Sequence, residues 1–315
     1  NQYVIAQDIK TKKIWLISPT GQTSAMSKAE FKKYHVATFA ANGAWSPFSA
    51  NGISGAYLAV DSEALNNYYG FQRYEHLGTY DPFITYAHEL FHSLQQDDWQ
   101  ASKYHPTATG DDEERDSDTK ARTKRMLLIQ QLALAISDSK NQEQHLKDAV
   151  ATYNDYKGKN PTDFKASFDA DRMEGTAYYY ELKASLYAGY PSQIKNDQDV
   201  QAAISLLLKN DNPAYRASGA ISEGYNVGGY AGILLDRLAI SNGESPDKWK
   251  AELKSDGASS PMSLLAAKFA TNTLPQPQKS PSKHELKTWL AGAEKIQQRG
   301  SKVANIFNGI YSILF

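Results

Sequence analysis

The sequence contains no cysteine. This absence excludes disulfide scaffolds, thiolate-bound zinc, iron–sulfur clusters and thiol nucleophiles, because each of them needs cysteine sulfur. It leaves the cellular compartment open, since a chain without thiols is indifferent to the redox conditions around it.

The chain also lacks an excess of charge of either sign, with 34 Lys and Arg against 35 Asp and Glu and a formal net charge of −1. A nucleic-acid-binding protein needs a basic excess on some face, so the composition predicts no DNA or RNA partner. No uninterrupted apolar run reaches the roughly 18 residues of a membrane span. The most apolar stretch, 126–129, runs directly into Gln130 and Gln131. We therefore expect a soluble protein with no membrane span.

Hydrophobic residues make up 41% of the 315 positions and charged residues 22%, a balance that permits a real core. A chain of this length forms one large domain or two packed lobes. It begins with Asn1 rather than Met, so we expect either a processed product, from which a signal segment is one candidate for what was removed, or a trimmed chain. Together with a composition rich in Asn, Gln, Lys and Tyr, this favours a secreted or periplasmic bacterial protein. The oligomeric state stays open.

The first sixty residues combine strand and helix patterns. Short apolar runs at 3–6 and 14–17, separated by a polar turn around 10–12, are typical of a β-hairpin. We expect a short helix at 27–34 and a further strand at 53–60.

From about Asp81 the pattern is almost wholly helical. Asp81 followed by Pro82 is a strong helix start, and that helix should run to about Gln96. Pro161 should open the approach to a later helix. The remaining helices are expected at 119–138, 141–157, 170–188, 198–209, 225–240, 246–254, 261–271 and 283–298.

These patterns predict an α+β, mostly helical fold. We expect an N-terminal α/β subdomain at 1–99, a helical subdomain at 100–273, and a linker with C-terminal helices packed on the same unit at 274–315. The acidic stretch 111–118 lacks the alternating ligands and central glycine of a calcium loop. We interpret it as a solvated loop that leads into a helix N-terminus.

One short motif carries chemistry, the H-E-x-x-H sequence that begins at His88. His88 and His92, four residues apart, share one helix face, so both imidazoles can reach a single metal ion. Glu89 lies beside them and can reach a water on that ion. The motif falls inside an amphipathic helix, as this chemistry requires, and it predicts one bound Zn²⁺.

A catalytic zinc site needs a third protein ligand. Asp98 stands six residues after His92, but without a glycine turn the helix rotates it to the wrong face. His105 lies in a loop with no supporting pattern. Glu174 is the better candidate, because a carboxylate on a second helix can approach the histidines where Gly175 lets the backbones come close. Glu181, seven residues later on the same face, is a candidate to orient a histidine. The competing interpretation is a Tyr-rich core helix with a surface glutamate.

Taken together, an N-terminal part with strands, an H-E-x-x-H helix and a later Glu-Gly-x-Ala-x-Tyr sequence resemble the gluzincins, the thermolysin-like and aminopeptidase-like zinc peptidases. The segment 225–235 is similar to a Tyr-x-x-Gly helix that often follows in that superfamily, and 260–265 fits its closing helices. The resemblance covers roughly residues 50–270 and implies a zincin-like fold, with His88, His92 and Glu174 as the ligands of one zinc ion.

The chain departs from that pattern in two respects. The interval from His92 to Glu174 is long, which inserted helices between 119 and 157 explain. The Gly-x-Met-Glu-Asn strand of the aminopeptidase branch is missing, and the equivalent region reads Gly-Ala-Tyr-Leu-Ala at 55–59. The glutamate that would hold a free substrate amine is therefore absent, which favours an endopeptidase.

The resemblance implies hydrolysis of peptide bonds in a peptide or protein substrate through a metal-activated water, with Glu89 as the general base. A further donor should stabilise the oxyanion, and Tyr225, Tyr230 and His76 are the candidates in that order. The strand at 53–60 is expected to pair with an extended substrate by main-chain hydrogen bonds.

Two interpretations compete with a peptidase. In the first, the chain is a catalytically inactive zinc-binding or scaffolding protein, although it retains Glu89. In the second, it is a helical interaction protein in which the motif is accidental. The glycines at 228, 229 and 232 do not indicate a nucleotide loop, because no βαβ unit surrounds them, and they predict close helix packing instead.

Overall fold

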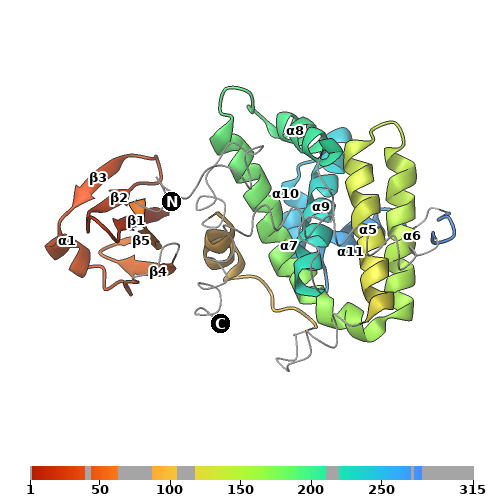
Figure 1. Cartoon of the computed structure of the whole chain (residues 1–315), viewed down its shortest axis with the longest axis horizontal. Coiled ribbons are helices and arrows are strands. Elements are labelled where there is room, and N and C mark those ends of the chain that lie inside the picture. The colour runs from red at the N-terminus through yellow and green to blue at the C-terminus, as the bar shows by residue number, and fades with distance from the viewer. Residues whose placement is uncertain are drawn as a thin grey trace. The chain divides into compact units, whose positions relative to one another are not determined.

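The computed structural model describes residues 2–39, 44–62, 87–104, 118–210, 220–270 and 273–278 (Figure 1). The chain divides into two compact units, Asn1–Asp97 with Gly300–Phe315, and Asp98–Arg299. The described part of the first unit holds a mixed β-sheet, and that of the second is almost entirely helical. The predicted α+β class is therefore confirmed.

The sheet of the first unit has five strands in the order β3-β2-β1-β5-β4. β1 and β5 pair in parallel, whereas the other neighbouring strands pair antiparallel. The bounds are β1 (Tyr3–Asp8), β2 (Ile14–Ile17), β3 (Thr23–Met26), β4 (Trp45–Ala50) and β5 (Ile53–Val60).

The predicted hairpin at 3–17 is confirmed, and Asp8 closes its turn. The Asp8 carboxylate accepts hydrogen bonds from the backbone N–H of Lys10 at 2.9 Å, from the Thr11 hydroxyl, and from the Ser62 hydroxyl at 2.7 Å. Burial alone would raise the pKa of Asp8, but these hydrogen bonds hold it well below its ordinary value. One carboxylate thus fastens the turn after β1 to the residues that follow β5.

The strand at 53–60 is present as β5, but its expected role is wrong. β5 pairs with β1 on one side and with β4 on the other, so its main-chain groups are used inside the sheet. Gly55 allows this close pairing, because a Cβ atom there would lie 1.7 Å from the carbonyl oxygen of Tyr3. An extended substrate cannot add to a strand that already has two neighbours.

The two strands that sequence patterns missed are the edges of this sheet, β3 and β4. β3 reads Thr-Ser-Ala-Met and is mostly exposed, while β4 contains Pro47, which has no N–H to donate. Edge strands tolerate both features, since one side of each pairs with nothing else in the sheet.

Helix α1 (Lys28–Lys32) completes the core of this unit. It lies within the predicted segment 27–34, and Ser27 and Glu30 form a capping box at its start. Phe31 is the buried residue of α1, and its ring lies 5.7 Å from that of Tyr57. The core cluster consists of Ile5, Ile14, Phe31, Ala44, Phe48, Tyr57 and Ala59.

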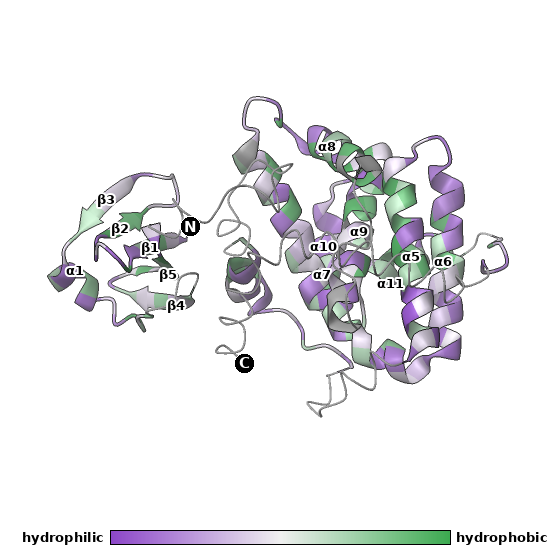
Figure 2. Ribbon diagram, in the orientation of Figure 1, coloured by the Kyte–Doolittle hydropathy of each residue, from purple (hydrophilic) through white to green (hydrophobic). Residues whose placement is uncertain are grey.

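Seven helices form the described part of the second unit. They are α5 (Thr119–Ser137), α6 (Gln142–Lys159), α7 (Pro161–Gly189), α8 (Asp197–Asn210), α9 (Ala220–Ser241), α10 (Asp247–Ser255) and α11 (Pro261–Ala267). Figure 2 shows that α5 is far more hydrophobic than α6, in keeping with the many buried residues of α5. Among the described residues, no helix has the length and apolar character needed to cross a membrane.

The predicted helices agree with these seven, and the largest difference is at α7. Pro161 is the first residue of α7 itself, so the helix begins nine residues before the predicted start at 170. Proline is favourable there because the first N–H groups of a helix have no partner within it. The N-cap of α5 is Asp118, the last residue of the acidic stretch, as predicted. The expected start at Asp81 and the helix at 283–298 lie outside the described residues.

Helices α7 and α9 pack closely through glycines. A Cβ atom on Gly175 would lie 2.4 Å from Cα of Gly228, and one on Gly228 would lie 2.0 Å from the carbonyl oxygen of Asp171. The prediction of close helix packing is confirmed. Gly175, however, faces α9, so its small size serves this contact and gives no support to the expected approach toward the histidine helix.

A buried charge network joins α5, α7 and α9. The guanidinium of Arg125 binds both carboxylate oxygens of Asp171, at 2.5 and 3.0 Å, and donates from Nε to Glu223 at 2.8 Å. Arg122 contacts Glu223 and Asp163. Burial raises the pKa of Glu223 to about 7, although the two arginines act in the opposite direction. Each of these charges has an opposite charge beside it, as buried ions require.

Candidate metal site

The H-E-x-x-H motif lies on a helix, as predicted. Residues 87–91 are α-helical, and the π-helix η2 (His92–Gln96) continues directly from them. His88 is buried and His92 is half-buried. Wider helical turns of this kind occur frequently at functional sites.

The two histidines turn the same ring atom toward each other. The Nε2 atoms of His88 and His92 lie 3.1 Å apart, and the rings are nearly perpendicular at 74°. A tetrahedral zinc ion with bonds of 2.0–2.1 Å separates two ligand nitrogens by about 3.3 Å. The imidazole pair therefore has the spacing that one zinc ion requires.

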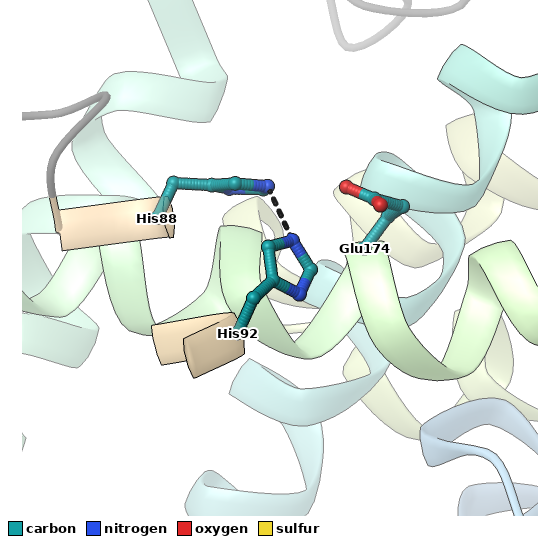
Figure 3. A group of neighbouring side chains, drawn as sticks. All are labelled: His88, His92 and Glu174. Atoms are coloured by element: carbon teal, nitrogen blue, oxygen red, sulfur yellow. Dashed lines mark hydrogen bonds between the residues drawn. The ribbon is translucent and has the colours of Figure 1, made fainter. Parts of the chain in front are cut away.

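Glu174 is the third member of the group. It lies in the middle of α7 and is half-buried. One ligand atom from each of His88, His92 and Glu174 lies within 4.8 Å of the others, and Figure 3 shows the Glu174 carboxylate directed toward the two rings. These three residues form a group that could hold one metal ion.

The donor set fits zinc. Two imidazoles and one carboxylate are a ligand set of catalytic zinc sites, which keep a fourth position open. A tetrahedral zinc ion holds its ligand atoms about 3.3 Å apart. One ligand atom from each of the three residues lies within 4.8 Å of the others, so binding an ion there requires the three side chains to draw closer together.

Sequence patterns missed one residue of this site, Gln96. Its Oε1 lies 2.6 Å from Nδ1 of His92, on the far side of the ring from Nε2. Gln96 is buried, although it ends the helix beside exposed Gln95 and Asp97. The available signal was the spacing, because 88, 92 and 96 follow one another at intervals of four along the same helix face.

Glu89 follows His88 on the same helix and is half-buried. Its carbonyl oxygen accepts a hydrogen bond from the Ser93 hydroxyl at 3.1 Å, a contact within the helix. Its role as a general base stays a prediction.

The sequence also offered Asp98 and His105 as alternative metal ligands and Glu181 as a partner of a histidine. Asp98 is exposed and pairs with Lys254 at 2.5 Å, so it is engaged away from the His88/His92/Glu174 group. His105 lies outside the described residues. Glu181 is 1% exposed on α7, and its predicted role in orienting a histidine stays a prediction.

Of the three oxyanion candidates, two are described and both lie on α9. The half-buried ring of Tyr225 packs edge-on against Tyr178 with centroids 6.3 Å apart. Tyr178 stands four residues after Glu174 on α7, so it shares a face of that helix with it. Tyr230 is 3% exposed and also lies beside Tyr178. His76 lies outside the described residues.

Comparisons of this chain with protein family models, with curated proteins and with solved structures found no match. The resemblance to the gluzincins therefore depends on the motifs alone.

Proposed function

We propose that the chain is a zinc-dependent peptidase of zincin-like fold, and that it cleaves within peptides rather than at their ends. The observation that carries the proposal is the grouping of His88, His92 and Glu174 within 4.8 Å, with Glu89 next to the first histidine. The two imidazoles and the carboxylate are the proposed ligands of one Zn²⁺.

His88, His92 and Glu174 would hold the zinc ion, which would supply a bound water of lowered pKa and would polarise the carbonyl of the scissile bond. Glu89 is the general base in this proposal. It accepts a proton from the water that attacks the carbonyl carbon and passes the proton to the departing amine nitrogen. The position of Glu89, one residue after His88 on the same helix, supports this role.

Tyr225 is the proposed donor to the oxyanion of the tetrahedral intermediate. Its support is positional, because its half-buried ring packs against Tyr178, which lies one helical turn after Glu174. A phenol hydroxyl placed there can donate to developing negative charge. Tyr230 ranks below it, since the Tyr230 side chain is almost fully buried in the helical unit.

The competing function is that of a zinc-binding protein without peptidase activity. The presence of Glu89 favours the enzyme, because metal binding alone does not require a carboxylate at that position. The missing amine-binding glutamate supports cleavage within a chain over removal of single N-terminal residues.

The deciding experiment combines metal analysis with substrate mapping. We expect about one zinc ion per chain, and cleavage of a mixed peptide library that stops with a chelator and returns with added zinc. The Glu89→Gln variant should keep its zinc and lose activity by several orders of magnitude. If the chain binds zinc but cleaves no peptide of the library, the inactive zinc-binding protein is favoured. If the purified chain binds no zinc, the proposed metal site is wrong.

A further inference from the structure

We propose that Gln96 is the positioning residue that sets the tautomer of His92. In this inference, which rests on the proposed metal site, the Gln96 side-chain oxygen accepts a hydrogen bond from the Nδ1–H group of His92. The Nε2 lone pair of that ring is then directed toward the position of the cation. Gln96 acts through His92 and does not itself bind the metal.

The geometry at Nδ1 carries this inference. Gln96 Oε1 lies 2.6 Å from His92 Nδ1, a short and well-formed hydrogen bond. A neutral imidazole has one N–H and one lone pair, and an oxygen acceptor at Nδ1 selects the tautomer whose proton is on Nδ1. Gln96 is 5% exposed, so water competes little for this contact.

The assignment at His92 has a consequence for the ring of His88. The Nε2 atoms of His88 and His92 lie 3.1 Å apart, a hydrogen-bond distance that one proton must occupy (Figure 3). If His92 carries its proton on Nδ1, His88 must donate from Nε2. The inference therefore predicts two different tautomers in the metal-free protein, Nδ1–H at His92 and Nε2–H at His88.

If the side-chain amide of Gln96 were rotated by 180°, the opposite position would be predicted for the His92 proton. If the Gln96 side chain donated its NH₂ group to Nδ1, the proton of His92 would lie on Nε2, the atom expected to bind the metal. Bound metal would then have to displace that proton and break the contact with Gln96. The two arrangements thus differ in one observable, the position of the His92 proton.

The direct test is nitrogen NMR of the metal-free chain with labelled histidine, at about pH 8, where free imidazole is neutral. The signals of His88 and His92 can be assigned among the seven histidines with one substitution at each. We expect a proton on Nδ1 of His92, and its movement toward Nε2 in Gln96→Leu. A His92 proton on Nε2 in the unaltered chain would overturn the inference.

Zinc affinity, measured by competition with a chromophoric chelator, gives the second readout. Gln96→Leu should weaken binding by about 10- to 100-fold, the usual effect of removing such a partner. Gln96→Glu keeps an oxygen acceptor and should bind at least as tightly as the unaltered chain. The matched control is Gln95→Leu, the same substitution at the exposed neighbouring position, which should change affinity by less than about twofold.

These outcomes separate the inference from the proposed function. If the chain binds zinc but cleaves no peptide, the peptidase fails while the affinity series still tests Gln96. If the chain binds no zinc, the tautomer in the metal-free protein still decides whether Gln96 sets it. Equal zinc affinity of Gln96→Leu and Gln95→Leu would contradict a positioning role for Gln96.

Discussion

Arg125 and Asp171 form a fully buried, two-point ion pair that joins α5 to α7 one helical turn before Glu174. The guanidinium nitrogens lie 2.5 and 3.0 Å from the two carboxylate oxygens, and Arg125 has no exposed surface. The pair links α5 to the part of α7 that lies just before Glu174.

Arg125→Met should lower the free energy of unfolding of the helical unit by about 3–5 kcal/mol, because it leaves Asp171 and Glu223 buried without that cation. Denaturant unfolding followed by circular dichroism at 222 nm measures this loss. The control is Lys147→Met, which breaks the pair between half-buried Lys147 and exposed Glu143 on α6 and should cost less than about 0.5 kcal/mol. Similar losses for the two variants would contradict a structural role for the buried pair.

Gly228→Ala should destabilise the helical unit by about 1–3 kcal/mol, because its Cβ would lie 2.0 Å from the Asp171 carbonyl oxygen and force α7 and α9 apart. Gly158→Ala is the matched control, since no atom lies within 4 Å of its Cβ position on α6. That change should stabilise the chain by about 0.5–1 kcal/mol through helix propensity. Thermal melts of both variants test the sign of each effect.

Asp8→Asn should weaken the hairpin of the first unit by about 1–3 kcal/mol at pH 7, because a charged acceptor of several hydrogen bonds is lost. The pKa of Asp8 is lower in the folded chain than in the unfolded one. Its contribution is therefore complete above the unfolded pKa of about 4 and is lost as the pH falls through the folded value.

Hydrogen exchange of the intact chain, followed in the proteolytic fragment that covers residues 1–20, measures the stability of this hairpin directly. The measured exchange rates are corrected for the intrinsic rates at each pH. The difference between the unaltered chain and Asp8→Asn should shrink as the pH is lowered from about 4 to 2. Asp61→Asn, which removes a longer 3.7 Å contact with Lys10, is the control and should cost less than about 1 kcal/mol. A difference that is constant over this pH range would rule out the charge of Asp8 as its origin.

Glu174→Ala should bind zinc at least 10-fold more weakly than the unaltered chain, since one of three protein ligands is missing. Added zinc should raise the melting temperature of the unaltered chain and raise that of the variant much less. Glu252→Ala, an exposed glutamate on α10, should behave as the unaltered chain does. An unchanged zinc stoichiometry and affinity in Glu174→Ala would remove Glu174 from the ligand set.

Tyr225→Phe should keep its zinc and reduce kcat by about 10²–10³, the usual loss when one oxyanion donor is removed. The ring contact with Tyr178 is retained in this variant, so stability should change little. Tyr230→Phe should stay within a few-fold of the unaltered rate. The reverse ranking would transfer the proposed role to Tyr230.

Much of the secondary structure followed from local patterns. The helical pattern of the sequence predicted α5, α6, α8 and α10 to within two residues, because the signals that start, continue and end a helix are encoded in neighbouring residues. The edge strands β3 and β4 were not predicted, because an exposed strand that contains serine or proline has no alternating apolar pattern. The paired position of β5 was also missed, because strand order depends on residues distant in the sequence.

The sequence by itself determined that His88, Glu89 and His92 lie next to one another on one helix. The spacing of His88, Glu89 and His92 places them along one helix wherever that helix lies, because helical geometry is local. It also determined that no thiolate holds a metal in this chain, since the sequence has no cysteine.

The sequence also named Glu174 as a candidate, through its Glu-Gly-x-Ala-x-Tyr motif, but only the tertiary structure groups its carboxylate with the two rings. Glu174 is 82 positions beyond His92 (174 minus 92), so their proximity is not a local property. The contact between Gln96 and the His92 ring likewise came from the structure alone. Gln96 is close in sequence, yet its burial depends on what covers the helix. Burial and long-range proximity are properties of the packed chain, because they arise from contacts between residues that periodicity does not relate.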